Sequence, residues 1–302
     1  ITNGSMGYIA TDCGIGSMWL ENSREMRVSP PAERALDLSG PEYISVDYQG
    51  RSVSIFAAND AFPCRVSYFP GYAVWEKRLG SKRLKTTVFI PRDINARVVL
   101  IEGAEGLSLK WGLKLCLGGR SGASVTGYVR DGVAHFENSE SYMPGKEFLA
   151  SFSGSSKFSV DHCPAALSLE GSCGEQSLLV CGFCSEEELR RLMAPGPASA
   201  ALAGVWARWG GLLGGFSLRS CSSALDHYMS RWAVYQCVAC RMEGRSSLYQ
   251  SGGAFGFRDQ LQDSVNLMLI DPSYAREQII SCCRHQYLEG DVMHWWHAHP
   301  QG

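Results

Sequence analysis

Hydrophobic and polar residues alternate in short segments of the chain up to about residue 180. The segments cover residues 44–48, 51–56, 84–90, 107–115 and 126–136. Two dipeptides, Gln49-Gly50 and Asp131-Gly132, interrupt the alternation as hairpin turns do. A strand that alternates in this way buries one face and exposes the other. The pattern therefore predicts a large antiparallel β-sandwich.

The period of the hydrophobic pattern changes near Ser185. Ser185 and Glu188 have the spacing of a capping box, which predicts a short helix that ends before Pro195 and Pro197. Residues 194–204 are therefore the best domain boundary. The expected organisation is a sandwich domain of residues 1–193, a helical linker of residues 194–220 and a helical region of residues 221–302.

Three helices are predicted after this boundary. Residues 222–243 form one amphipathic helix of about five turns, because their apolar residues recur at spacings of three, four and seven. Its apolar face consists of Leu225, Tyr228, Met229, Trp232, Tyr235, Gln236 and Ala239. A second helix is predicted over residues 258–270. A third begins with Asp271 as N-cap and Pro272 in the first turn, and ends just before Gly290.

The chain has 302 residues, of which 45% are hydrophobic and 19% are charged. This composition is typical of a globular protein with one large or two medium domains. A net charge of -2 and a pI near 6.4 give no basic surface for a nucleic acid or an anionic membrane, so we expect neither partner. No apolar run is long enough for a membrane helix, and the N-terminus lacks a signal peptide pattern. We therefore expect a cytoplasmic protein. Because the chain begins with Ile1 and stops shortly after His299, we also expect a fragment of a longer polypeptide.

The twelve cysteines are expected to be reduced and mostly buried, since several lie within apolar runs and the chain is too long for a small disulfide scaffold. Cys181 with Cys184 and Cys237 with Cys240 have CxxC spacing, so a four-thiolate zinc site is an alternative. The second pair lies within a helical pattern rather than on a turn. We therefore predict no metal and no organic cofactor.

A polar cluster follows a flexible aromatic segment at residues 252–257. Arg258 beside Asp259 places a bidentate donor next to a bidentate acceptor, which suits the vicinal hydroxyls of a sugar. Aromatic residues could supply an apolar platform for the sugar ring. They are Tyr249, Phe255 and Phe257. The alternative is a buried pair of Arg258 with Asp259 or Asp263 that only caps a helix.

Histidines and tryptophans cluster near the end of the chain, in the segment DVMHWWHAHP. His294, His297 and His299 lie around Trp295 and Trp296. A metal site and simple packing remain alternatives, but the histidine spacing matches no common zinc motif. Tryptophans beside hydrogen-bonding imidazoles favour a pocket for a carbohydrate or an anion.

Residues 244–263 and 271–297, with their RDxxQD and HWWH segments, resemble the glycoside hydrolase family 94 phosphorylases, and residues 7–30 resemble that family's opening strands. The family includes cellobiose, chitobiose, cellodextrin and β-1,2-oligoglucan phosphorylases and the phosphorylase-like end of cyclic β-1,2-glucan synthases. The resemblance implies a multidomain β + α fold. Its parts are a large antiparallel β-sandwich, a helical linker and an (α/α)6 barrel, of which residues 221–302 would be the first helices.

The resemblance also implies a glycosyltransferase that acts as an inverting phosphorylase. Inorganic phosphate would attack the anomeric carbon of a β-linked gluco-oligosaccharide, with an acid protonating the leaving oxygen, to release α-D-glucose 1-phosphate. Phosphate is already an anionic nucleophile, so no second carboxylate is needed to activate water. The implied protein is bacterial and homodimeric.

The family's motifs carry over to individual residues of this chain. Arg245, Arg258 and Asp259 match contacts to the donor sugar, and Gln262 and Asp263 complete the RDxxQD motif. The expected pocket wall consists of Tyr249, His294, Trp295, Trp296 and His297. The family's general acid is expected beyond residue 302, together with the phosphate-binding residues. No catalytic residue is therefore assigned here, and we expect the 302-residue chain alone to be inactive.

One departure from the family pattern bears on the substrate. Disaccharide phosphorylases usually have an arginine directly after the Gly-Gly pair, where this chain has Ala254. This favours the β-1,2-glucan branch over the cellobiose branch. The alternatives are a phosphorylase-like domain of a cyclic β-1,2-glucan synthase, a non-catalytic carbohydrate-binding protein, and a structural module in which Arg258 and Asp259 form a buried pair.

Overall fold

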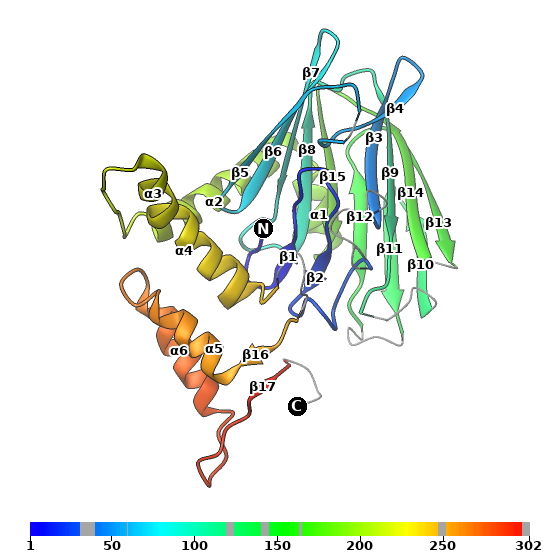
Figure 1. The fold of residues 1–302 in the computed structure, drawn as a ribbon. Helices are drawn as coiled ribbons and strands as arrows, with labels where there is room; N and C mark the ends of the chain where they lie inside the picture. Colours follow the sequence, from blue (N-terminus) through cyan, green and yellow to red (C-terminus); the bar gives the residue numbers. More distant parts are fainter. Residues whose placement is uncertain are drawn as a thin grey trace.

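The computed structural model describes residues 1–30, 40–58, 60–118, 124–139, 145–162, 165–246 and 252–297. Figure 1 shows the strands gathered in one body, with the later helices beside and below one end of it. One sheet has eight strands in the order β10-β11-β12-β15-β8-β7-β6-β5, and the other has five in the order β13-β14-β9-β3-β4. Every pair of neighbouring strands in both sheets is antiparallel.

The strands cover most of the first 182 residues. The eight-stranded sheet contains β5 (Cys64–Phe69), β6 (Tyr72–Leu79), β7 (Lys82–Phe89), β8 (Ala96–Glu102), β10 (Val125–Arg130), β11 (Val133–Asn138), β12 (Phe148–Phe152) and β15 (Gln176–Gly182). The five-stranded sheet contains β3 (Glu42–Tyr48), β4 (Arg51–Ser54), β9 (Ser108–Lys114), β13 (Ser156–His162) and β14 (Ala165–Ser172). A separate pair, β1 (Met6–Tyr8) and β2 (Met18–Leu20), precedes them.

Both hairpins expected from turn dipeptides are confirmed. Strands β3 and β4 pair across Gln49 and Gly50, and β10 and β11 pair across Asp131 and Gly132. All four turn residues have positive φ angles, between 49° and 75°. Two-residue hairpins of the primed type need this conformation, which asparagine, aspartate and glycine adopt most readily.

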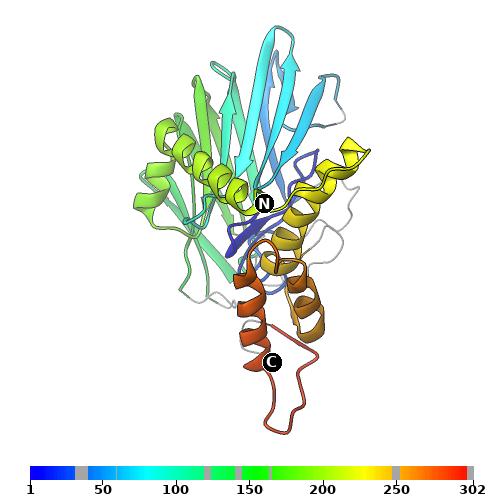
Figure 2. The ribbon, with the colours of Figure 1, turned by 90° about the vertical axis from the view of Figure 1, so that its left-hand side faces the viewer.

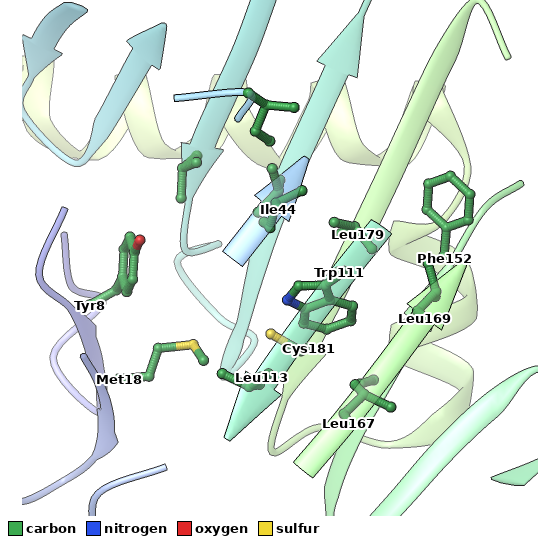
Figure 3. Close-up of a cluster of buried hydrophobic side chains, with 14 of the residues drawn as sticks. Tyr8, Met18, Ile44, Trp111, Leu113, Phe152, Leu167, Leu169, Leu179 and Cys181 are labelled. Carbon is green, nitrogen blue, oxygen red and sulfur yellow. The ribbon is translucent and has the colours of Figure 1, made fainter. Parts of the chain in front are cut away.

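The sandwich core lies between the two sheets and contains Trp75 and Trp111, both fully buried. Figure 3 shows Trp111 of β9 among Ile44, Leu169 and Leu179, side chains that come from both sheets. The alternation seen in the sequence therefore reflects side chains directed into one shared core. Burial of apolar surface of this kind is the main stabilising contribution to such a domain.

A charged pair lies inside this apolar core. The Arg97 guanidinium donates to both carboxylate oxygens of Glu42, with Nη1 to Oε2 at 2.6 Å, and the Trp111 indole donates to Glu42 Oε1 at 2.7 Å. Both charged side chains are almost completely buried. Burial alone would lower the pKa of Arg97, but the Glu42 carboxylate raises it above its usual value. The Arg97 guanidinium therefore stays charged in the core, and its bonds to Glu42 connect the two sheets.

Helices α1 (Glu186–Leu192) and α2 (Pro195–Leu213) cover the outer face of the eight-stranded sheet. Figure 2 shows these helices lying across the strands. The capping box of Ser185 and Glu188 is confirmed, with both reciprocal hydrogen bonds present. The prolines separate the two helices as expected, and Pro195 itself occupies the first turn of α2, where its missing N–H costs no hydrogen bond.

We expect Ser185→Ala to lower the free energy of unfolding by about 1 kcal/mol, because the N–H of Glu188 loses its acceptor at the start of α1. Urea unfolding followed by circular dichroism measures the change. Ser159→Ala on an exposed position of β13 is the matched control, and it should change the stability by less than about 0.5 kcal/mol. Equal effects of the two substitutions would contradict the capping role.

The helix predicted over residues 222–243 is present, but only part of the predicted apolar face is buried. The segment runs through α3 (Ser223–His227), the π-helical segment η2 (Tyr228–Trp232), α4 (Ala233–Gln236) and the π-helical segment η3 (Cys237–Glu243). Leu225, Tyr228, Met229 and Gln236 are exposed, and the residues buried against the sandwich side are Val234, Tyr235, Val238 and Ala239. π-Helical turns close at i to i+5, so the face drifts from the 3.6-residue period.

The last two helices are shorter than predicted. Helix α5 spans Phe257–Val265 and α6 spans Pro272–Cys283. The Asp271 cap is confirmed, since its Oδ1 accepts from the Ser273 N–H at 3.0 Å. The predicted end near Gly290 is wrong: α6 ends at Cys283, and Gly290, with φ of 96°, lies in a turn whose N–H donates to Tyr287 O. Glycine marks this turn because its left-handed backbone excludes most side chains.

The cysteines that the structure describes are free thiols. Four are buried, namely Cys116, Cys173, Cys181 and Cys282, whereas Cys221, Cys240 and Cys283 are exposed. The expectation of mostly buried thiols is therefore only partly met. In the described ranges, no helix is both long and apolar enough to cross a membrane.

Candidate functional site

A cavity of about 370 Å³ lies where the end of η3, the Gly252–Gly256 segment, the start of α5 and the last strand meet. Its lining consists of Cys240, Arg241, Arg245, Ser246, Gly252, Gly253, Ala254, Gly256, Asp259, Gln260, His294 and Trp295. A volume of this size falls within the range of small-ligand sites, which begins at about 300 Å³. The cavity brings together the two sequence segments that were singled out for their chemistry.

A short strand pair joins these two segments. Strand β16 (Phe255–Gly256) pairs with β17 (Trp295–Trp296), so Phe255 is opposite Trp296 and Gly256 is opposite Trp295. The Phe257 N–H also donates to the His294 carbonyl at 3.1 Å. The ladder places Asp259 and Trp295 on the walls of one cavity although 35 residues separate them.

The Gly-Gly turn is fixed against the beginning of the chain. Asn22 Nδ2 donates to the Gly253 carbonyl at 3.2 Å and lies 3.3 Å from His297 Nδ1. Gly253 has φ of 63°, and a Cβ at this position would lie 2.3 Å from Asn22 Oδ1. Glycine is therefore required here, both for its backbone conformation and for this close approach.

Arg245 forms the back of the cavity and has an unusual backbone, with φ of 46° directly after the helix end. Its guanidinium donates to three main-chain carbonyls: Glu21 O at 2.9 Å, Met242 O at 3.2 Å and Gly253 O at 3.4 Å. It also stacks over the Phe255 ring at 3.9 Å. A guanidinium has five N–H donors, so two of them have no acceptor among the described residues.

Burial lowers the pKa of the Arg245 guanidinium to about 10, and Glu243 opposes this shift. The group therefore stays positively charged at neutral pH. Among the described residues, its hydrogen-bond partners are main-chain carbonyls, and no carboxylate binds it to neutralise the charge. An oxygen-rich ligand would find a fixed cationic donor here.

Asp259 and Arg258 lie in the first turn of α5 and are both open to solvent. Their side chains are 61% and 81% exposed and contact each other at 3.3 Å. The alternative of a buried pair that serves only as a cap is therefore wrong. Asp259 lines the cavity, whereas Arg258 and Gln262 do not, and Arg258 Nη1 donates to Gln262 Oε1 at 3.0 Å along the helix surface.

Asp263 is directed away from the cavity and pairs with Arg241 Nε at 2.8 Å. The residue of this motif that sequence reasoning missed is Gln260, which is buried and lines the cavity. Its Oε1 accepts from the N–H of Gly256 at the start of α5. The sequence does not indicate this role, because Gln260 stands in a run of polar residues. Its burial depends on how β16 packs against α5.

The aromatic and histidine residues divide into two groups. His294 and Trp295 line the cavity and are exposed, so they are available to a ligand. Trp296 is buried behind them, stacked on Phe255 at 5.6 Å and on His285 at 3.9 Å. His297 packs against Trp295 at 5.4 Å and approaches Asn22. Tyr249 and His299 lie outside the described residues.

This arrangement suits a ligand rich in hydroxyl groups. Asp259 is the one carboxylate in the described lining, and among the described residues its carboxylate contacts only Arg258. It can accept two hydrogen bonds from adjacent hydroxyls, while Arg245 can donate from another part of the lining. The indole of Trp295 offers an apolar surface beside these polar groups, a combination typical of sugar sites.

Comparison with known proteins gives matches that include this site. Residues 208–301 match the catalytic domain of the glycosyl hydrolase 94 superfamily. The cyclic β-(1,2)-glucan synthase NdvB of Rhizobium meliloti (strain 1021) is 28% identical over 235 residues, which cover 75% of this chain and 8% of that protein. The N,N'-diacetylchitobiose phosphorylase of Vibrio furnissii is 30% identical over 98 residues, which cover 32% of this chain and 12% of that protein. The chain thus spans only about a tenth of the length of these relatives.

Solved structures with low sequence identity share the fold. A bacterial glucoamylase complexed with acarbose has a TM-score of 0.60 at 8% identity, over 98% of this chain and 52% of that chain. A protein from the human microbiome described as a kojibiose phosphorylase has a TM-score of 0.52 at 8% identity, over 93% of this chain and 42% of that chain. These likenesses support the order of a β-sandwich followed by helices. They show the fold alone, while the match to the catalytic domain of the glycosyl hydrolase 94 superfamily covers residues 208–301.

Proposed function

We propose that the protein is part of a glycoside phosphorylase that cleaves β-linked gluco-oligosaccharides with inorganic phosphate to give α-D-glucose 1-phosphate. The observation that carries the proposal is the cavity beside the β16–β17 ladder, which Asp259, Trp295 and His294 line together. Phosphorylases among the relatives support the same reaction type.

In this proposal the cavity holds the donor sugar. Asp259 accepts from two neighbouring hydroxyls, and Arg245 donates to ring or hydroxyl oxygens through the two N–H groups that have no acceptor among the described residues. Trp295 covers the apolar face of the ring. Arg258 orients Asp259 from the solvent side, since the two groups lie 3.3 Å apart.

The chemical step needs one acid and one nucleophile. Phosphate attacks the anomeric carbon as the bond to the leaving sugar breaks, and the acid delivers its proton to the leaving oxygen. Asp259 is not that acid in our proposal, because a carboxylate that binds the hydroxyls of the donor must stay ionised. We assign the acid and the phosphate site to sequence beyond residue 302.

β-1,2-Linked glucans are the proposed substrate class. The match to a cyclic β-(1,2)-glucan synthase covers 75% of the chain, far more than the 32% covered by the chitobiose phosphorylase match. The same match makes a phosphorylase-like domain of a synthase the second candidate. The third candidate is a non-catalytic carbohydrate-binding protein, which would bind a glycan in this cavity without cleaving it. The homodimer and the cytoplasmic location stay predictions.

The test is phosphate release from α-D-glucose 1-phosphate by the protein as the cell makes it, with sophorose, cellobiose, laminaribiose or glucose as acceptor. Release with sophorose and not with cellobiose is the expected result. If the folded protein releases no phosphate with any acceptor, the phosphorylase proposal is contradicted. Glycan binding or a role in a synthase would then remain. The 302-residue chain alone is expected to show no turnover.

Asp259→Asn is expected to reduce the rate of phosphate release about 100-fold, because two hydrogen bonds from hydroxyls to a charged acceptor are weakened. Glu277→Gln, an exposed carboxylate of α6 away from the cavity lining, is the matched control and should retain the activity of the unmodified protein. Equal activity of the two variants would show that Asp259 does not bind the donor sugar.

A further inference from the structure

A second cavity, of about 210 Å³, lies between the end of the β5–β6 hairpin, the first strands of the chain and the η2–η3 helix. It shares two lining residues, Cys240 and Ser246, with the candidate donor-sugar cavity. The two cavities therefore adjoin each other at the end of η3. We refer to the second one as the aromatic cleft.

Aromatic rings make up much of the cleft. Its floor contains the buried side chains of Tyr8, Trp19 and Tyr235, and its rim contains Tyr68 and Phe69, which are 45% and 40% exposed. Side chains of this size are seldom left open to solvent next to a cavity without a use. No charged side chain is found in the described lining.

The rim is held rigidly in place. Phe69 stacks on Tyr72 with centroids 4.6 Å apart and rings within 6° of parallel. The intervening Gly71, with φ of 82°, leaves no room for a Cβ because the Trp209 indole of α2 would lie 2.3 Å away. Backbone contact with α2 thus fixes the hairpin end. Rigid aromatic groups bind ligands at low entropic cost, because little motion is lost.

Neutral polar groups accompany the rings. Burial raises the pKa of Tyr68 to about 12, so its hydroxyl remains neutral and able to donate. Gln236 is exposed on the helix side of the cleft. Ser246 Oγ is buried where the two cavities adjoin and has no hydrogen-bond partner among the described residues. A buried hydroxyl without a partner is costly unless a ligand or water satisfies it.

These features fit a neutral carbohydrate better than other ligands. A phosphate, a nucleotide or a metal ion binds through charged side chains, which the described lining lacks. Sugar rings combine an apolar face, which packs on aromatic rings, with hydroxyl groups that bind the amide and hydroxyl side chains. Contact with the donor-sugar cavity through Cys240 and Ser246 points to the same class of ligand.

We propose that the aromatic cleft is a second carbohydrate-binding site, which holds a distant part of the neutral glucan chain whose end occupies the donor-sugar cavity. The choice of glucan rests on the proposed function. Binding in the cleft would increase the affinity of the protein for long chains and leave disaccharide binding unchanged, because a disaccharide is too short to occupy both cavities.

The test is isothermal titration calorimetry of the full protein with sophorose and with a β-1,2-glucan of about ten glucosyl units. A Tyr68→Ala/Phe69→Ala double variant is expected to bind the long glucan about ten-fold more weakly and sophorose as before, because two stacking surfaces are removed. Tyr43→Ala, an exposed tyrosine of β3 outside the cleft, is the matched control and should change neither affinity.

Asp259→Asn, measured alongside, separates this proposal from the proposed function. If this variant binds sophorose normally but the aromatic variant loses long-chain affinity, the donor-sugar assignment fails and the aromatic cleft remains. Unchanged affinity of the aromatic variant for the long glucan overturns the second site, whatever Asp259→Asn does. Failure of the unmodified protein to bind the glucan at all overturns both.

Discussion

Glu42→Gln is expected to lower the free energy of unfolding by about 3–5 kcal/mol, a large part of the stability of a typical domain. The substitution keeps the shape of the side chain and leaves an oxygen for the Trp111 indole, but it removes the negative charge that faces Arg97. The guanidinium would then be a buried charge without a counterion, close to the Tyr8 ring at 4.8 Å. Urea unfolding followed by far-ultraviolet circular dichroism measures the loss.

Glu170→Gln is the matched control for this experiment. Glu170 lies in the same sheet and pairs with Lys110 at 3.1 Å, but both side chains are at least half exposed. An exposed pair contributes at most about 1 kcal/mol, so this variant should unfold almost as the unmodified protein does. A double change, Glu42→Leu with Arg97→Met, should recover much of the loss. Equal effects of the two glutamine variants would contradict the account of a buried pair.

Trp296→Ala is expected to release the strand pair that builds the candidate site. The indole is buried between Phe255 and His285, and removal of a buried tryptophan costs about 3–5 kcal/mol. The N–H of Phe257, which donates to the His294 carbonyl, should exchange with solvent much faster. Amides in β8 and β15 should keep their protection, because they belong to the sandwich. Hydrogen exchange resolved along the chain measures both.

The neighbouring Trp295→Ala provides the control. This side chain is 52% exposed and lines the cavity, so its loss leaves little buried surface unfilled. Exchange at Phe257 should change by less than a tenth of the effect of Trp296→Ala. If both substitutions accelerated exchange equally, the stack of Phe255, Trp296 and His285 would not be what holds β16 and β17 together.

Local sequence patterns were enough to predict the sandwich hairpins and the helix caps. Turns such as Asp131-Gly132 depend on a few adjacent residues, and so do the capping box at Ser185 and the Asp271 cap. The interactions that stabilise these turns and caps lie within a few neighbouring residues. The (α/α)6 barrel and the domain boundaries implied by the family stay predictions.

Local sequence patterns did not predict features that depend on contacts between residues far apart in the chain. The buried face of residues 223–243 was only partly predicted because π-helical turns follow from tertiary packing and leave no simple periodic signal. The pairing of β16 with β17 identified Trp295 as a cavity residue and Trp296 as a packing residue, although the two are adjacent and chemically identical. Neither the contact of Asn22 with Gly253 nor the burial of Gln260 could be inferred from neighbouring residues.

The contact of Asn22 with Gly253 has a consequence for the order of events during synthesis. The last strand of the sandwich ends at Gly182, so the whole sandwich leaves the ribosome well before Gly253 does. Domains generally fold as units from the N-terminal end during translation. Asn22 and the Glu21 carbonyl would then be in place as a preformed template, on which Gly253, Arg245 and finally His297 dock as they appear. The folded sandwich would thus provide the surface on which the segment around Gly253 assembles after it leaves the ribosome.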